Sequence, residues 1–128
     1  MGNNSGLVRV QNLTNQAVIA DRVYVAECFF DRLRGLIGKN LENGMGMLFP
    51  KNNSIHMWFM SFPIDVVFIR KEKSADGKII FKVSSVHENV RPWRPHPLMD
   101  WRASETLELP NGTVRRCAIT AGDELCIS

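Results

Sequence analysis

The sequence predicts a mainly β, β-rich α+β domain, built as a small barrel or sandwich, with one amphipathic helix near residues 28–37. Short β-branched apolar segments alternate with turn-forming residues along most of the chain, which is typical of strands joined by tight turns. Helical periodicity over several turns appears in a single segment. The 128 residues, 45% of them hydrophobic, suit one compact domain.

A polar tail over residues 1–6 is expected to precede the domain, which we place at residues 7–128. Three β-branched segments bounded by turn-forming residues predict the first strands, and they are Leu7–Asn12, Ala17–Ala20 and Val23–Ala26. The period then becomes helical, with apolar residues at positions 29, 33, 36 and 37. Gly38 is expected to end this helix.

The middle of the chain predicts a hairpin of long strands. Met47–Pro50 reads as a short strand, and Ile55–Met60 is a further apolar run. Pro63–Arg70 is almost continuously apolar, so we expect a central strand covered on both faces. The pair Asp76-Gly77 favours a hairpin turn, which leads into a long strand over Ile79–Val90.

The last third begins with a proline-rich loop. Prolines at 92, 95 and 97 exclude a helix or a central strand from Arg91–Pro97. A strand over Ser104–Pro110, one or two helical turns in Gly112–Ala118 and a final strand over Glu124–Ile127 complete the chain. Many short strands with one substantial helix are typical of a barrel or a sandwich.

Charge and hydropathy exclude several classes of partner. Sixteen Lys and Arg residues against thirteen Asp and Glu residues give a net charge of +3. The basic residues are scattered along the sequence and form no continuous stripe, so no nucleic-acid partner is expected. No apolar stretch is long enough to span a bilayer, so no membrane segment is expected. The first residues have neither a basic start nor an apolar run, which predicts a cytoplasmic protein without a signal peptide.

The cysteines do not predict a metal site. Cys28, Cys117 and Cys126 lack Cys-x-x-Cys spacing and a nearby histidine, so we expect neither zinc nor another cofactor. An odd number argues against a disulfide framework, and all three are expected to be reduced. Pairing of Cys117 with Cys126 stays open at this point.

The segment Ser54–Asp65 has the most unusual composition. In strand alternation His56, Trp58 and Met60 share one face, so an imidazole, an indole and a thioether together form one candidate lining for a pocket. The alternative is that this face belongs to the core, with its ring nitrogens bonded to the backbone.

Asp65 opens an apolar strand, so its carboxylate is expected to be buried and to need a partner. The guanidinium of Arg34, Arg91 or Arg94 would supply a charge-assisted contact. Such a pair would either lock a loop to the sheet or bind a ligand, and the sequence leaves both readings open.

The proline-stiffened loop presents Trp93 and Arg94, the composition of interaction hot spots. The alternative is that Trp93 plugs one end of the barrel. Together these segments give the candidate ligand-binding set, which is Arg34, His56, Trp58, Met60, Asp65, Trp93 and Arg94.

No nucleophile elbow, zinc-protease motif, P-loop or dinucleotide fingerprint is present. We therefore expect a monomeric binding module for a small polar or anionic ligand or a peptide segment. One alternative is a hydrolase-like enzyme that uses Asp65 or Glu88 with His56, with or without a metal. Another is a structural or protein-interaction domain, which exposed Trp93 and Trp101 would favour.

Seven short motifs in a fixed order carry a family resemblance. They are Arg32–Ile37, Gly46–Phe49, His56–Met60, Pro63–Phe68, Pro92–Arg94, Leu107–Pro110 and Gly122–Asp123. Over about residues 17–127 the chain resembles the bacterial and archaeal family called domain of unknown function 192. The resemblance implies a compact β-rich domain with a short helix carrying the Arg-Gly-Leu element, and it implies no activity. Because many members look like exported proteins, it also leaves export of a longer precursor open.

Overall fold

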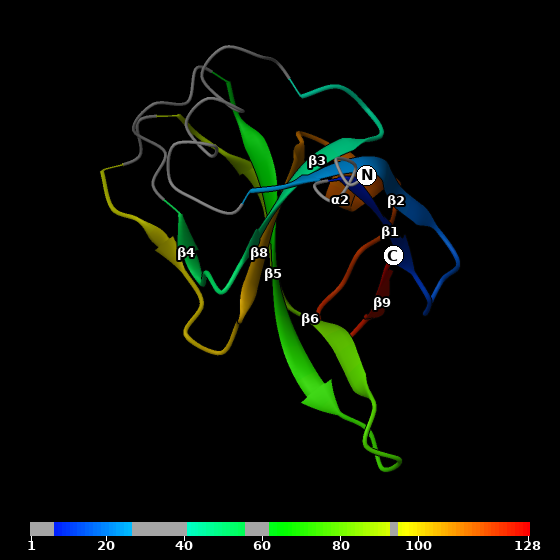
Figure 1. Ribbon diagram of the computed structural model, residues 1–128. Coiled ribbons are helices and arrows are strands. Elements are labelled where there is room, and N and C mark those ends of the chain that lie inside the picture. The colour runs from blue at the N-terminus through cyan, green and yellow to red at the C-terminus, as the bar shows by residue number, and fades with distance from the viewer. Residues whose placement is uncertain (1–6, 27–40, 56–61, 93–94) are drawn as a thin grey trace.

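The computed structural model describes residues 7–26, 41–55, 62–92 and 95–128. Seven strands close into a barrel in the order β1-β2-β3-β8-β5-β6-β9, and β4 and β7 form a separate two-stranded sheet (Figure 1). The mainly β, barrel-like prediction is therefore confirmed. The strands are β1 (Leu7–Asn12), β2 (Val18–Val25), β3 (Met45–Pro50), β4 (Ser54–Ile55), β5 (Ile64–Lys73), β6 (Ile79–Val90), β7 (Leu98–Met99), β8 (Glu105–Pro110) and β9 (Glu124–Ile127).

Most strands follow the sequence expectations. The strands β1, β6 and β9 have the expected bounds. Two segments expected as separate strands form the single strand β2. The backbone N–H groups of Asp21 and Arg22, which lie between the two segments, both donate to the carbonyl of Gly44, so the strand continues through the expected turn. The short strand β7 was not expected. Residues 27–40, which contain the expected amphipathic helix, lie outside the described residues, and the described helix is α2 (Thr113–Arg116).

The pairing is antiparallel throughout the barrel except between β2 and β3, which run parallel. The strand β9 lies between β1 and β6 and closes the barrel. Backbone bonds in both directions between Arg9 and Ser128, at 2.9 and 3.0 Å, continue this contact past the end of the strand. No helix in the described part of the chain has the length and apolar character that a bilayer crossing requires.

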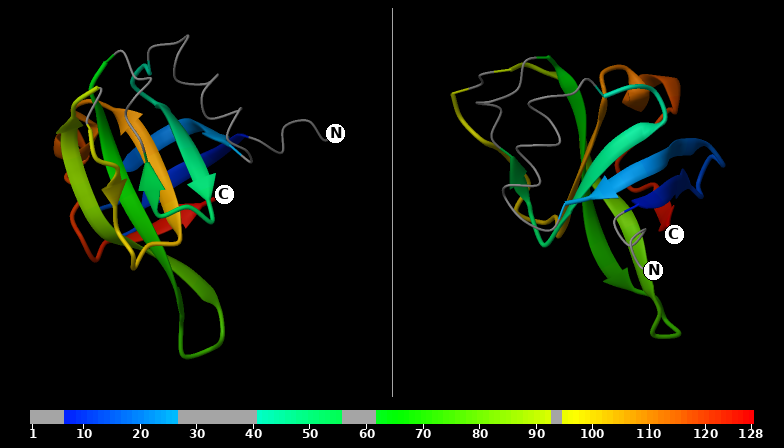
Figure 2. Two further views of the ribbon diagram at one scale, coloured as in Figure 1. Left: turned by 90° about the vertical axis from the view of Figure 1, so that its left-hand side faces the viewer. Right: turned by 45° about the horizontal axis from the view of Figure 1, so that its top comes forward.

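Two apolar cores share the central strands. Alternate residues of β5 and β8, among them Val67 and Leu107, belong to the barrel interior. The residues between them on β5, among them Val66 and Phe68, join a second core with residues of β4 and β7. Figures 1 and 2 show β4 and β7 beside the outer face of the barrel. Because both faces are covered, Ile64–Ile69 is buried throughout, as the apolar run predicted.

The hairpin of β5 and β6 extends beyond the barrel, and its tip lies far from α2 (Figures 1 and 2). Its turn lies at the expected Asp76-Gly77 pair, where Gly77 has a φ of 87°. The backbone N–H of Ser74 donates to the carbonyl of Lys78 at 2.8 Å and closes the turn.

Candidate functional site

Asp65 is fully buried near the start of β5, and its carboxylate accepts three backbone N–H groups. Oδ1 accepts from Asn89 at 2.9 Å, and Oδ2 accepts from Gly112 at 3.0 Å and from Val114 at 2.9 Å. The carboxylate therefore ties β5 to the end of β6 and to the first turn of α2. We call these four residues the Asp65 clamp.

Local backbone geometry explains why the clamp forms. The register between β5 and β6 shifts opposite Asp65, and Asn89 has a φ of 52° in the unpaired stretch. Gly112, the N-cap residue of α2, has a φ of 97° and no side chain to cap the helix. Because Val114 is the second residue of α2, Asp65 supplies from another strand the oxygen that a capping side chain would normally give.

Of the three arginines expected to partner Asp65, only Arg91 lies in the described residues, whereas Arg34 and Arg94 lie outside them. Within the described residues the carboxylate of Asp65 is held by backbone N–H groups and not by the guanidinium of Arg91. Backbone groups at a bulge and at a helix start already point at the buried oxygens, so no second charge needs to be desolvated. The reading of Asp65 as a lock between a loop and the sheet is supported, and direct ligand contact by Asp65 stays a prediction.

The other members of the predicted set lie outside the described residues, so their convergence with Asp65 stays a prediction. They are Arg34, His56, Trp58, Met60, Trp93 and Arg94.

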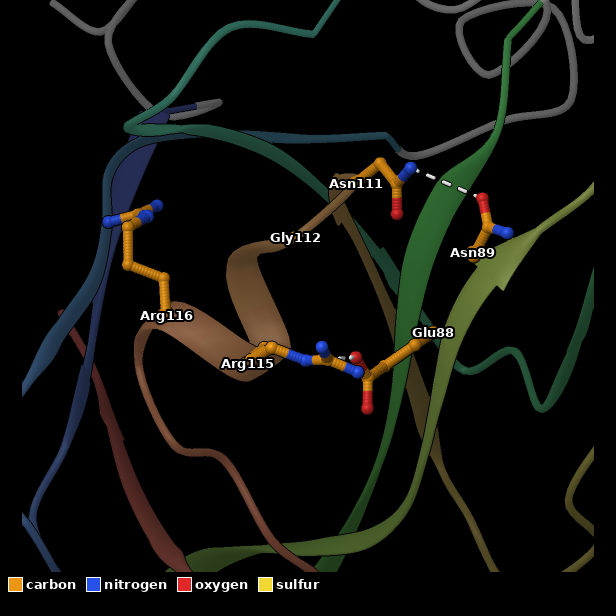
Figure 3. Close-up of a pocket in the computed structure, with 6 residues that line it drawn as sticks. All are labelled: Glu88, Asn89, Asn111, Gly112, Arg115 and Arg116. Atoms are coloured by element: carbon orange, nitrogen blue, oxygen red, sulfur yellow. Dashed lines mark hydrogen bonds and ion pairs between the residues drawn. The ribbon is translucent and has the colours of Figure 1, made fainter.

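A hollow of about 430 Å³ opens beside the Asp65 clamp, between the end of β6 and the turn from β8 into α2. Figure 3 shows the lining residues around the short helix. They are Glu88, Asn89, Asn111, Gly112, Arg115 and Arg116. Asn89 and Gly112 belong both to the lining and to the clamp, so the buried carboxylate fixes the backbone on two sides of the hollow.

Two side-chain contacts cross the hollow. Nε of Arg115 lies 3.6 Å from Oε1 of Glu88, in an exposed ion pair. Nδ2 of Asn111 donates to Oδ1 of Asn89 at 3.2 Å. Figure 3 shows Arg115 reaching toward Glu88, whereas Arg116 points to the other side of the turn. The two guanidinium groups against one carboxylate leave a net charge of +1 on the lining.

Apart from Glu88, which the hydrolase alternative named, sequence reasoning did not assign these lining residues to a site. The burial of Asp65 was a usable signal, but its three partners lie 24, 47 and 49 residues away, and their direction depends on tertiary backbone geometry. Asn111-Gly112 directly after a buried strand, followed by Arg115-Arg116, is the pattern that would have drawn attention to this turn.

A second polar cluster surrounds Asp100, on the turn between β7 and β8. Its Oδ2 accepts from the hydroxyls of Ser84 and Ser85, both at 2.7 Å, and Oδ1 accepts from the backbone N–H of Arg102 at 3.0 Å. Adjacent serines reach one carboxylate because the register of β5 and β6 shifts between Phe68 and Ile69.

The chemistry of this cluster favours support over catalysis. Burial of Asp100 disfavours its charged form, but the hydroxyls of Ser84 and Ser85 outweigh it and hold the pKa of Asp100 below its usual value. Oγ of Ser85 also lies 3.2 Å from Nε2 of His87, so the serine stands between the carboxylate and the imidazole. A nucleophilic serine instead needs the imidazole between itself and the carboxylate.

The described cysteines and acids give no sign of a bound metal. In the described ranges no group of three or more His, Cys, Asp or Glu side chains is placed to hold one. Cys117 is buried and Cys126 is exposed, and both are free thiols, so they do not pair with each other.

Comparison with known proteins places the chain among uncharacterised relatives. The model of the family DUF192, described as "Uncharacterized ACR", matches residues 10–127. A "UPF0127 protein" of the archaeon Thermococcus sibiricus is 30% identical over 119 residues, covering 89% of this chain and 71% of the relative.

Two solved structures share the fold. A putative transcription regulator from Sinorhizobium meliloti aligns with a TM-score of 0.69 at 24% identity, covering 94% of this chain and 91% of the other. A protein of unknown function from Novosphingobium aromaticivorans aligns with a TM-score of 0.71 at 21% identity, covering 94% and 83%. At these identities the likeness establishes the fold alone.

Proposed function

The chain belongs to the DUF192 family, whose description assigns no activity, and we propose that it is a binding module for an anionic ligand. The observation that carries the proposal is the hollow of about 430 Å³, lined by two arginines and two asparagines. Its volume falls within the range of small-molecule sites, and every lining residue except Gly112 carries a polar or charged side chain.

The Asp65 clamp supports binding because it fixes the hollow before a ligand arrives. Three charge-assisted hydrogen bonds hold the backbone of Asn89, Gly112 and Val114. Asn89 and Gly112 have left-handed backbone conformations. A site held in its bound shape loses less conformational entropy on association, so affinity rises.

The charges of the hollow favour an anion. A guanidinium presents several N–H donors in a planar fork that matches a carboxylate or a phosphate. The side chain of Arg115 is 85% exposed, and its pair with Glu88 is weak for that reason. Arg116 has no ion pair with a carboxylate of the described residues, and its direction away from Arg115 favours a ligand with two separated anionic groups or an acidic peptide segment.

The asparagines add neutral polar contacts. Their mutual bond uses Nδ2 of Asn111 and Oδ1 of Asn89, which leaves a carbonyl on Asn111 and an N–H₂ group on Asn89 for a ligand. One acceptor and one donor beside the arginines would fix the orientation of a bound carboxylate or amide.

A hydrolase is less well supported. The oxygens of the buried Asp65 already accept three backbone N–H groups, so this carboxylate is not presented to a substrate. Glu88 forms an exposed ion pair with Arg115. His56, the proposed partner of these acids, lies outside the described residues.

A monomeric, cytoplasmic protein belongs to the same proposal. The free thiols of Cys117 and Cys126 are typical of a reducing compartment. Gel filtration with light scattering tests the monomer, and fractionation of cells that express the tagged full-length gene tests the location.

The test is titration of the purified protein with succinate, inorganic phosphate and a short glutamate-rich peptide, followed by amide NMR shifts and calorimetry. We expect at least one probe to shift the amides of Asn89, Gly112 and Arg115, with a Kd between micromolar and millimolar. Arg115→Gln and Arg116→Gln should each weaken binding about tenfold, as expected for a charged hydrogen bond.

Lys73→Gln is the matched control, because it removes one exposed positive charge on the hairpin, away from the hollow. Its affinity should equal that of the wild type. Absence of shifts with all three probes, or shifts that persist unchanged in the double arginine variant, would refute the proposal.

A further inference from the structure

We infer that the turn between β7 and β8 is a contact point for an anionic membrane surface. Trp101 on this turn is 80% exposed and Met99 is 59% exposed, the two largest exposed fractions among the large apolar side chains of the described residues. Single exposed apolar residues are common, but a nearly free tryptophan next to an exposed methionine is not. We call Met99, Trp101 and Arg102 the Trp101 tip.

The two apolar side chains of the tip are both exposed, although the residue before each of them in the sequence is buried. Leu98 and Asp100 are buried, whereas Met99 at the end of β7 and Trp101 in the turn that follows are both exposed. Figures 1 and 2 place this turn at the periphery of the barrel. The indole and the thioether, two residues apart, are therefore both open to solvent at this turn.

The turn that carries Trp101 is firmly held. The backbone N–H of Asp100 donates to the carbonyl of Asn53 at 3.0 Å, and that of Ala103 donates to the carbonyl of Asp100 at 3.0 Å. The side chain of Asp100 accepts from two serines and from the backbone of Arg102. Exposure of the indole is thus a fixed property of the fold, which lowers the entropic cost of contact.

The charges around the tip are cationic. The guanidinium of Arg102 lies 6.0 Å from the centre of the Trp101 ring, and its side chain is 62% exposed although Nε lies 3.7 Å from Oδ1 of Asp100. Both carboxylates in residues 98–105, those of Asp100 and Glu105, are buried and already bonded. Lys51 is a further exposed cation. It lies on a segment next to this turn, because the following residue, Asn52, donates its backbone N–H to the carbonyl of Ser104.

The small size of the tip favours a membrane surface over a protein partner or a second copy of the chain. A stable protein interface buries about 800 Å² on each partner and takes roughly 20–30 residues a side. Two exposed apolar side chains do not approach that, and a symmetric pairing of two copies would bring one Arg102 toward the other. A lipid headgroup region needs no matching shape, accepts tryptophan, and attracts cations.

The test is co-sedimentation of the purified full chain with vesicles of phosphatidylcholine, alone or with about one third phosphatidylglycerol. We expect binding to the anionic vesicles, little binding to phosphatidylcholine alone, and loss of binding at high salt. Trp101→Ala should lower the partition coefficient about tenfold. Arg102→Gln should lower it about fivefold, as expected for one cation near an anionic surface.

Tyr24→Ala is the control, because it removes an aromatic ring that is 45% exposed on β2, in another part of the barrel. It should bind like the wild type. Equal binding of wild type and Trp101→Ala, or no preference for anionic vesicles, would overturn the inference. A concentration-dependent dimer that Trp101→Ala abolishes would also overturn it, since the tip would then be an interface between two copies.

Discussion

Asp65 and Asp100 are both buried carboxylates, 0% and 7% exposed, yet they hold the chain through different donors. Asp65 accepts three backbone N–H groups, whereas Asp100 accepts two serine hydroxyls and one backbone N–H. A backbone N–H keeps its direction when the acceptor is lost, but a hydroxyl can rotate to another acceptor. The end of the barrel near α2 therefore depends on its aspartate more than the turn near β7 does.

The largest effect is therefore expected from Asp65→Ala. Loss of the carboxylate leaves three inward-pointing N–H groups without an acceptor, so the free energy of unfolding should fall by about 3 kcal/mol or more. Urea unfolding followed by circular dichroism measures it. Asp21→Ala, at a side chain that is 63% exposed in an ion pair, should change it by no more than about 0.5 kcal/mol. Equal losses at both sites would contradict the role of the clamp.

Asp100→Asn should cost less, about 1–2 kcal/mol at neutral pH, because the serine hydroxyls can turn to the remaining oxygen. Its effect also depends on pH. Since the pKa of Asp100 is lowered by folding, its contribution is complete above the ordinary value of 3.8 and is lost as the pH falls through the lower folded value. Unfolding curves measured down the acid range should therefore converge for wild type and variant, and curves that stay parallel would sink this prediction.

Gly112→Ala and Gly77→Ala separate the hollow from the hairpin. Both glycines have positive φ, 97° and 87°, and an added methyl group would meet open space at either one, so each substitution should cost about 1 kcal/mol from backbone strain alone. Ligand titration should distinguish them, because only Gly112 lines the hollow. We expect weaker binding for Gly112→Ala and unchanged binding for Gly77→Ala. The reverse order would place the ligand elsewhere.

The smallest effect is expected from Glu88→Gln. Removing this carboxylate frees Arg115 from an exposed pair worth less than about 1 kcal/mol, so anion affinity should rise about two- to fivefold. Calorimetry with the probe that binds the wild type best measures the change. Asp21→Asn removes a surface charge on β2 and should leave the affinity unaltered. A fall in affinity for Glu88→Gln would mean that Glu88 itself contacts the ligand.

Most of the strand architecture could be predicted from the sequence because the signals are local. The unbroken apolar run from Ile64 to Ile69 specified a strand buried on both faces, and Asp76-Gly77 specified the hairpin turn. The continuous strand β2 was read as two pieces because Asp21 and Arg22 resemble a turn. Their pairing to Gly44 depends on β3, which no local pattern reports.

The candidate site was predictable only in part, because its geometry is set by distant segments. Burial of Asp65 followed from its place in the strand, but its backbone partners come from the end of β6 and the start of α2. Nothing in the sequence distinguishes Trp101, which is exposed, from a core tryptophan. Its exposure follows from the hydrogen bonds that hold the neighbouring Asp100 in place. Two of them come from Ser84 and Ser85, which a β-bulge brings to the same carboxylate.

The position of β9 between β1 and β6 has a consequence for synthesis on the ribosome. The pairing of Val10 with Ile127 joins the first described strand to the last, so the barrel cannot close until the end of β9 has left the exit tunnel. Until then β1 and β6 each carry an open row of backbone donors and acceptors. Nascent chains that stall before β9 should therefore be the species most prone to capture by chaperones or to aggregation.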